Sequence, residues 1–315
     1  MHLEKLIFRP ATEADIPEIV KLLKLSLGES LMPKSEEYWR WKHVNNPFGP
    51  SPVLLAMDGN KLVGVRAFMR WEWRRGNQIK KAVRAVDTAT HPDYQGEGIF
   101  KKLTLSLVEE CKKEGVDIIF NTPNEKSEPG YLKIGWLEAG RFPIGVAIKK
   151  PLSVFFQAII GSRRHKEFIS SESFGLNIPA SFAMNCDRNK YSTNCSLDYF
   201  KWRYEKIPFI NYYSVSNQKA WVVFRLIKGR GGTELRVVDV FGKKIHLKQV
   251  LKNLFKFKEF DFMSIDGFNM NLLPSLIKLK SKIGPSVTVN ELRKKNSEFV
   301  DFSRWTPTIG DLEVF

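Results

Sequence analysis

The sequence predicts a mixed α/β fold, with helices on mixed β-sheets, in which one α/β unit occurs twice. Two observations predict this class: strand-like apolar runs alternate with amphipathic helix-like runs, and the order of these runs repeats along the chain. A length of 315 residues also suits about two domains. We therefore expect a first domain over residues 1–150, a linker with an apolar helix over 151–195, and a second domain over 196–315.

Four matches in the same order indicate the repeat. Residues 37–48 read EYWRWKHVNNPF and residues 198–209 read DYFKWRYEKIPF, so acidic, aromatic, basic and Pro-Phe positions recur at the same offsets. The other matches are a hairpin-like run (54–68 with 213–225), VRAVD with LRVVD (83–87 with 235–239), and a helix–strand pair (103–120 with 250–265). Chance could produce one such match, but four in order indicate two copies of one unit.

The first copy begins with a strand that ends near Thr12 and continues into an amphipathic helix. Thr12 suits an N-cap, and Asp15 stands three residues later as the acidic partner of a capping box. A hairpin over 53–75 and a strand that ends at Thr90 follow the helix. The apolar face of the helix consists of Ile16, Ile19, Val20, Leu22 and Leu23.

The turn over residues 91–100, HPDYQGEGIF, joins this strand to a helix-like run that starts at Ile99. The first N–H groups of a helix have no partner inside the helix, and the helix dipole adds partial positive charge there. Gly96 and Gly98 would let a phosphate approach the backbone, because neither has a side chain, and His91 is expected to be a turn residue. The turn is therefore a candidate phosphate or pyrophosphate site, and an ordinary strand–helix turn is the alternative.

A buried-looking strand at 116–120 leads into residues 121–136, NTPNEKSEPGYLKIGW. This succession of elements resembles the GCN5-related N-acetyltransferase (GNAT) superfamily, whose coenzyme-binding signature, Gln/Arg-x-x-Gly-x-Gly/Ala, is similar to residues 95–100. The resemblance covers residues 5–150 and extends to the second half only through the repeat. A downstream family pattern is matched by Asn124, Ser127, Tyr131, Gly135 and Trp136.

The resemblance implies acetyl-CoA as co-substrate and no metal. Its pyrophosphate would lie on the amides of residues 95–100, and its thioester between the strands that end at Thr90 and Phe120. Phe100 departs from the signature, which has a small residue there, so Phe100 either crowds the coenzyme or packs inward. The implied coenzyme-binding residues are Thr88, Ala89, Thr90, Gln95, Gly96, Glu97, Gly98, Ile99, Phe100, Asn121, Asn124 and Ser127.

For catalysis, the resemblance implies direct attack of a primary amine on the thioester in a ternary complex. A backbone N–H near Ala89 or Thr90 would polarise the carbonyl. Tyr131 would protonate the leaving thiolate, since a phenol and a thiol have comparable acidity; the alternative for Tyr131 is a core aromatic role. Asp87 is the candidate base, but its counterpart Asp239 lies in the copy without the glycine turn, which favours a structural role.

The second copy has FGKKIHL (241–247) in place of the glycine turn and no tyrosine over 272–283. We expect that it binds no CoA and instead walls the acceptor cleft and shields the edge of the first sheet. The glycine-rich run 229–233 is expected to be a hairpin loop. The apolar helix at 151–160 is followed by a basic run at 163–166; packing between the domains is expected, and a position on a membrane surface is the alternative.

Composition favours an intracellular protein. No apolar run reaches the roughly 20 residues of a membrane span, and the N-terminus has no signal-peptide pattern, so we expect a cytoplasmic location. The three cysteines, Cys111, Cys186 and Cys195, have neither metal-site nor disulfide spacing. The net charge of +16 suits an anionic partner such as coenzyme phosphates, an acidic carrier protein, nucleic acid or a membrane surface, or it is only a solvated surface.

The leading hypothesis is an acyl-CoA-dependent N-acyltransferase that acetylates a primary amine, with an amino sugar as the first candidate acceptor. Two alternatives stay open: a FemAB-like peptidyl transferase that takes aminoacyl groups from tRNA, and a non-catalytic GNAT-like binding module. The intact glycine turn favours CoA, because a tRNA donor does not require a pyrophosphate site. The sequence leaves open the acceptor, the choice between CoA and an acyl carrier protein as donor, and the oligomeric state.

Overall fold

The computed structural model divides the chain into two compact units, and neither unit is continuous in sequence. One unit comprises Met1–Gly140 and Ser286–Trp305, and the other comprises Arg141–Pro285 and Thr306–Glu313. The structure describes residues 3–28, 32–125, 127–160, 166–167, 174–179, 189–229, 231–274, 278–281, 284–293 and 298–312. The predicted basic residues at 163–165 and Cys186 lie outside these ranges.

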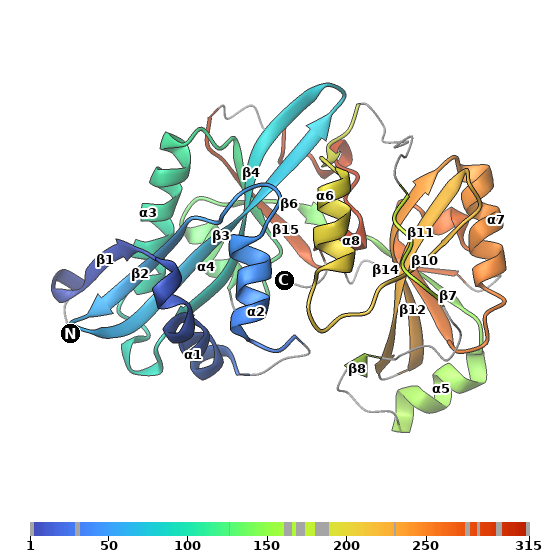
Figure 1. The fold of residues 1–315 in the computed structure, drawn as a ribbon, viewed down its shortest axis with the longest axis horizontal. Coiled ribbons are helices and arrows are strands. Elements are labelled where there is room, and N and C mark those ends of the chain that lie inside the picture. Colours follow the sequence, from blue (N-terminus) through green and yellow to red (C-terminus); the bar gives the residue numbers. More distant parts are fainter. Residues whose placement is uncertain are drawn as a thin grey trace. The chain divides into compact units, whose positions relative to one another are not determined.

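The first unit is built on a mixed sheet with the strand order β1-β2-β3-β4-β5-β15-β6 (Figure 1). The parallel pair in this sheet is β4 with β5, and the other pairs with a described register are antiparallel. The strands are β1 (Ile7–Pro10), β2 (Val53–Asp58), β3 (Lys61–Arg75), β4 (Gln78–Thr90), β5 (Ile118–Asn121), β6 (Leu137–Arg141) and β15 (Ser286–Glu291).

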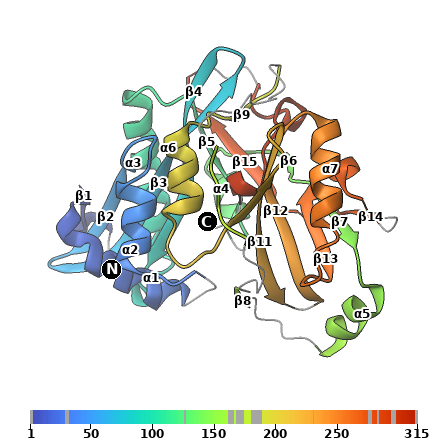
Figure 2. The ribbon, with the colours of Figure 1, turned by 45° about the vertical axis from the view of Figure 1, so that its right-hand side comes forward.

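Helices cover both faces of this sheet (Figure 2). On one face, α1 (Ile16–Leu27) packs Ile19 against Val65 and Ala89. On the other, α3 (Ile99–Lys113) and α4 (Glu128–Lys133) share a core with Phe68. The predicted capping box before α1 is present, since the backbone N–H of Thr12 donates to Asp15 Oδ2 at 2.8 Å. The predicted mixed α/β class is therefore confirmed for this unit.

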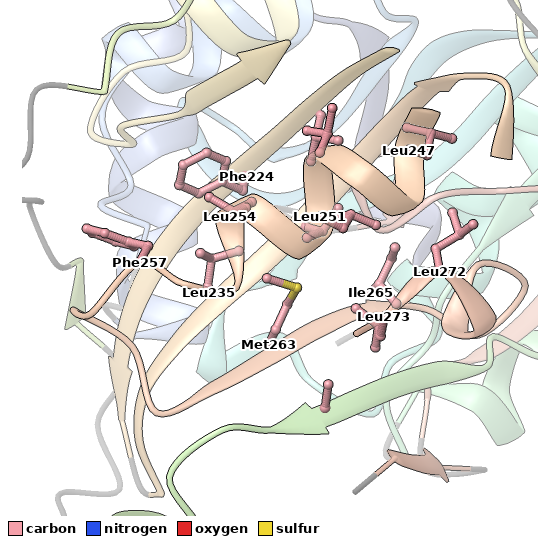
Figure 3. Packing of buried hydrophobic residues seen from close by; sticks show 14 of the residues in the cluster. Phe224, Leu235, Leu247, Leu251, Leu254, Phe257, Met263, Ile265, Leu272 and Leu273 are labelled. Atoms are coloured by element: carbon pink, nitrogen blue, oxygen red, sulfur yellow. The ribbon is translucent and has the colours of Figure 1, made fainter. Parts of the chain in front are cut away.

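The second unit has a sheet with the order β10-β11-β12-β13-β7-β14, and β12 and β13 form its parallel pair. Its core lies between this sheet and α7 (Lys244–Leu254), where Leu235, Leu251 and Met263 pack together (Figure 3). The strands are β7 (Ile144–Ile148), β10 (Tyr213–Ser216), β11 (Ala220–Gly229), β12 (Gly232–Gly242), β13 (Phe262–Asp266) and β14 (Lys278–Ser281), with β8 (Lys166–Glu167) beside β11. Shorter elements of this unit are β9 (Ser192–Thr193), α5 (Pro151–Ile160), α6 (Leu197–Phe200) and α8 (Ile309–Leu312).

The two units share one succession of elements. The order in the first unit is β2, β3, β4, α3 and β5. The corresponding order in the second unit is β10, β11, β12, α7 and β13. Each succession is preceded by a short helix that continues as a π-helical turn: α2 (Glu36–Trp39) into Arg40–Val44, and α6 into Lys201–Glu205. Ser35 and Ser196 cap these helices through equivalent 3.1 Å hydrogen bonds from Tyr38 N and Tyr199 N. The predicted hairpin loop at 229–233 joins β11 to β12, with Arg230 outside the described residues.

Each sheet pairs a strand with one that lies far away in the sequence. The strand beside β5 is β15, which lies far downstream, and the strand beside β13 is β7, which lies far upstream. The units therefore do not follow the predicted division at residues 150 and 196. The apolar pattern of a strand shows that the strand is buried, but it does not show which strand lies next to it.

Candidate active site

The parallel strands β4 and β5 pair over only part of their length. Their register runs from Ala82 opposite Ile118 to Arg84 opposite Phe120, and β4 then continues to Thr90. Among the described strands, residues 85–90 therefore pair with β3 on one side only. The N–H of His91 donates to Val63 on the β3 side, so the preceding N–H, of Thr90, points to the open edge. The predicted carbonyl-polarising group lies on this edge.

A turn with two left-handed glycines follows the open end of β4. Gly96 and Gly98 each have φ +83°, a conformation that favours glycine, and Gly98 is the N-cap of α3. Within the part of the chain that the structure describes, the amides of Gly96, Gly98, Ile99 and Phe100 donate to no backbone carbonyl. This turn therefore presents free donors at the start of a helix of 15 residues, which is the arrangement that binds an anion.

The side chains of His91 and Tyr94 stabilise the entry to this turn. His91 caps a 3₁₀ turn at Pro92–Tyr94 by accepting a 3.3 Å hydrogen bond from Asp93 N, as expected of a turn residue. The Tyr94 hydroxyl donates to Asp58 Oδ2 at 2.8 Å. Gln95 is exposed and has only a 3.5 Å contact with the Thr90 carbonyl, and Glu97 is half-buried.

Ile99 and Phe100 point away from the turn and into the protein. Ile99 is 1% exposed and lies in the core below α3. The ring of Phe100 contacts Tyr131 edge to face, with centroids 5.5 Å apart and planes at 84°. Phe100 therefore packs inward, and its size does not block the amides of the turn.

Tyr131 is buried, and its hydroxyl accepts a 2.7 Å hydrogen bond from Arg66 Nη2. Arg66 comes from β3 and is fully buried, with its guanidinium carbon 4.9 Å from the ring centre of Phe68, 5.5 Å from that of Phe100 and 5.3 Å from that of Tyr131. Among the described residues no carboxylate pairs with Arg66, and its Nε and Nη1 have no hydrogen-bond partner. Sequence reasoning missed Arg66, although an arginine inside the apolar run of β3 was a visible signal.

Asp87 lies at a bulge of β4, with φ +41°, and its carboxylate has two buried partners. Lys42 Nζ lies 2.7 Å and His43 Nε2 lies 2.8 Å from Asp87 Oδ2. The other ring nitrogen of His43 lies 2.9 Å from the Ser51 hydroxyl. Both Lys42 and His43 come from the π-helical turn after α2. Neither residue was predicted to have a role, although both lie inside the repeated segment.

The charges of this cluster follow from burial and pairing. Burial would raise the pKa of Asp87, but Lys42 and His43 outweigh burial and hold it below its ordinary value. Burial lowers the pKa of Lys42 and of His43 despite the attraction of Asp87, so His43 is neutral at pH 7. Asp87 is therefore an ionised and weakly basic carboxylate whose Oδ2 is occupied.

The second unit repeats part of this cluster. Tyr204, at the position of His43 in the repeat, donates a hydrogen bond to Asp239 Oδ2. Arg203, at the position of Lys42, donates to Tyr212 at 2.8 Å and twice to the Gly310 carbonyl. The contact between the residue at the position of His43 and the aspartate therefore recurs in a unit without the glycine turn, which is more consistent with a structural role than with proton transfer.

The remaining predicted residues are mostly engaged in local structure. Asn121 is buried and accepts a 2.5 Å hydrogen bond from Thr288 of β15. Asn124 Oδ1 accepts from Ser127 N at 2.9 Å, and Ser127 Oγ accepts from Asn124 N at 3.1 Å, so this pair closes the turn before α4. In β4, Ala89 is buried on the α1 face, the Thr88 hydroxyl lies 3.4 Å from the Val65 carbonyl, and the Thr90 carbonyl accepts from Ser26 at 3.0 Å.

The corresponding place in the second unit has a different electrostatic character. The pairing of β12 with β13 ends at Arg236 and Ser264, and a cavity of about 490 Å³ lies beyond it. Asp239, Asp266 and Asp311 line this cavity, and all three are at least 96% buried. Burial raises the pKa of each, that of Asp266 to about 6. Lys243 and Lys244 also line this cavity, so its polar groups are side chains rather than the backbone amides of a glycine turn.

Two further observations concern other site types. No group of three His, Cys, Asp or Glu suited to a metal ion occurs in the described ranges. No helix of the described chain has the length and apolarity needed to cross a membrane. Neither Cys111 nor Cys195 forms a disulfide with a described residue; Cys111 is buried, which raises the pKa of its thiol to about 12, and Cys195 is half-buried.

Comparison with known proteins gives one family. Residues 8–139 match the model of the acetyltransferase (GNAT) domain. No curated protein matches the chain. Among solved structures, a GCN5-related N-acetyltransferase from Anabaena variabilis is similar at 13% identity and a TM-score of 0.64, with 91% of this chain and 73% of that chain covered. One from Kribbella flavida is similar at 12% identity and a TM-score of 0.58, with 91% and 72% covered.

Proposed function

We propose that this chain, which contains an acetyltransferase (GNAT) domain over residues 8–139, transfers an acyl group from acetyl-CoA to a primary amine. One observation carries the proposal: the turn with two left-handed glycines opens α3 directly after the unpaired end of β4. The amides of the turn suit a pyrophosphate, and the open edge beyond it suits an extended chain that ends in a thioester. A plain strand–helix connection needs neither feature.

The bound coenzyme supplies an acyl group activated as a thioester, and the protein positions it. In the proposal, the Thr90 N–H polarises the thioester carbonyl while the amine attacks its carbon and the carbon–sulfur bond breaks. Tyr131 gives its proton to the departing thiolate. The amine nitrogen loses a proton to solvent. Asp87 is not the base in this scheme, because Lys42 and His43 occupy Oδ2 and lower its basicity.

Arg66 explains how Tyr131 can act as an acid. Since the phenol oxygen accepts a hydrogen bond from Arg66, the hydroxyl proton is directed to another acceptor. After proton transfer, the buried guanidinium stabilises the phenolate that remains. Arg66 is thus a positioning residue in the proposal. Among primary amines, an amino sugar is the acceptor class to test first.

Calorimetric titration with acetyl-CoA tests the proposal. Gly96 and Gly59 both have positive φ, and a Cβ at either would meet no atom within 4 Å, but Gly59 lies in the hairpin between β2 and β3. We expect Gly96→Ala to weaken acetyl-CoA binding at least tenfold, because strain distorts the turn and a methyl group covers its amides. Gly59→Ala carries a similar strain of about 1 kcal/mol and should bind like the wild type.

Two results would contradict the proposal. The first is the absence of wild-type binding at millimolar acetyl-CoA. The second is equal binding by the wild type and Gly96→Ala, which would place the coenzyme elsewhere. RNA binding that weakens steeply with salt would support the aminoacyl-tRNA alternative instead.

A further inference from the structure

The helix α5 exposes its apolar side. Its large side chains are 58–77% exposed, and no residue of the helix is buried. They occupy positions i, i+3, i+4, i+7 and i+8, which form one stripe along a helix. We name the set Leu152, Phe155, Phe156, Ile159 and Ile160 the α5 stripe.

The opposite side of α5 holds the helix on the second unit. Ser153, Val154, Gln157 and Ala158 are half-buried, and the Ser153 hydroxyl donates to Asp261 Oδ1 at 2.9 Å. Just before the helix, the backbone N–H groups of Lys149 and Lys150 both donate to the Asp261 carbonyl, at 3.0 and 2.9 Å. The helix is therefore fixed by its small and polar residues. This orientation is the reverse of that of an ordinary surface helix, whose apolar side faces the core.

The charge around α5 favours an anionic partner. The helix contains no acidic or basic side chain. Of the two lysines that precede it, Lys149 points its ammonium to the Phe257 carbonyl, whereas Lys150 is exposed and lies 3.6 Å from the mostly buried Asp261 carboxylate. Lys150 Nζ also donates to the Lys258 carbonyl at 2.8 Å, which brings the exposed Lys258 to the same end. The sequence after the helix continues with the basic residues of 163–166, which are mostly outside the described ranges, in a chain of net charge +16.

We propose that α5 binds the surface of an anionic phospholipid membrane. The α5 stripe would enter the boundary between headgroups and acyl chains, and the exposed Lys150 and Lys258 would contact the phosphates. The helix has 10 residues, about half of what a span requires, so it lies in the interface rather than crossing it. The stripe has no polar group that would select a particular protein surface. This proposal does not depend on the acyltransferase proposal.

Vesicle co-sedimentation of the full chain tests it. Vesicles of phosphatidylcholine with phosphatidylglycerol are compared with vesicles of phosphatidylcholine alone, at low and high salt. The double variant Phe155→Ser with Ile159→Ser removes two of the five side chains of the α5 stripe. Ile245→Ser on α7 is the control, because Ile245 is 72% exposed in the same unit. We expect wild type and Ile245→Ser to bind the anionic vesicles equally. Binding should fall at least tenfold in the double variant and on neutral vesicles, and several-fold at high salt.

Three outcomes would overturn the proposal. One is no sedimentation of the wild type with anionic vesicles. Another is equal binding by the wild type and the double variant. The third is concentration-dependent dimerisation, measured by analytical ultracentrifugation, that the double variant abolishes while vesicles fail to bind; a second copy of the chain would then cover the α5 stripe.

Discussion

At the scale of single residues, the contact between Arg66 and Tyr131 links the fold of the first unit to its proposed chemistry. A buried guanidinium without a carboxylate is costly unless other groups compensate it. The rings of Phe68, Phe100 and Tyr131 surround Arg66 and provide part of this compensation. The same arrangement gives Phe100 a role: its ring helps to enclose the guanidinium that holds Tyr131.

A double-mutant cycle separates this role from simple packing. We expect Tyr131→Phe to lower kcat for acetyl transfer by about a hundredfold, because the leaving thiolate loses its acid. Arg66→Met alone should also lower kcat, but it should have little further effect when it is added to Tyr131→Phe. The KM for acetyl-CoA should change little in either single variant. Steady-state kinetics measure both quantities.

Arg84 provides the control for this cycle. It is also a buried arginine, but it comes from β4 and donates to Thr122 at 2.8 Å. Its substitution by methionine should combine additively with Tyr131→Phe. If Arg66→Met is additive as well, Arg66 is a packing residue and does not act through Tyr131.

The raised pKa of Asp266 predicts how the stability of the protein depends on pH. Burial raises its pKa from 3.8 to about 6, so the folded protein holds a proton that the unfolded chain releases. The contribution of Asp266 to the free energy of unfolding is therefore fully present below pH 4. It decreases by about 3 kcal/mol as the pH rises from 4 to 6. Asp266→Asn should flatten the decline of the free energy of unfolding between pH 4 and pH 7, as measured by urea titration at several pH values.

Asp301→Asn is the matched comparison. The pKa of Asp301 is lowered by the Ser303 hydroxyl and backbone, so removing its charge should not flatten that decline. An unchanged slope in Asp266→Asn would show that the folded protein does not hold the extra proton.

At the scale of elements, local signals predicted the turn that opens α3 and the capping box at Thr12, whereas the caps of the two short helices were not predicted. Gly96 and Gly98 both adopt the left-handed conformation, and the Ser35 and Ser196 caps lie at equivalent places in the repeated segments. The π-helical turns after α2 and α6 were not predicted. Such a turn differs from an α-helix by one hydrogen-bond register, and the residue pattern is almost the same.

The residue pattern of α5 also did not predict which side of the helix faces the solvent. Apolar residues at helical spacing predict which residues share a face, and a buried apolar face is the usual consequence. The face is exposed here because Asp261 anchors the opposite side through Ser153. That anchor lies far away in the sequence, so no local pattern indicates it.

At the scale of the whole molecule, the exchange of β7 and β15 means that neither half of the sequence contains all strands of one sheet. Within the first unit, β15 covers the edge of β5, and the downstream Trp305 packs on Trp73 with ring centroids 4.7 Å apart. A fragment of residues 1–150 lacks both contacts and keeps β7 without β13 beside it. Exposed strand edges of this kind favour aggregation.

This topology predicts the behaviour of fragments. Residues 1–150 expressed alone should be insoluble or unfold without a cooperative transition, as measured by differential scanning calorimetry. Residues 1–141 joined by a short Gly/Ser linker to 284–305 restore β15 and Trp305, and this chain should be soluble and unfold cooperatively. A cooperative transition in the 1–150 fragment would show that β15 is dispensable for the first unit.

The residue pattern alone predicted the alternation of strands and helices, the capping box at Thr12, the glycine turn before α3 and the order in which the elements recur. The contacts between distant groups are visible only in the folded chain: Arg66 with Tyr131, Lys42 and His43 with Asp87, and β15 with β5. The spacing of apolar residues indicates which side chains are buried. Which distant side chain each of them contacts depends on the tertiary fold of the whole chain.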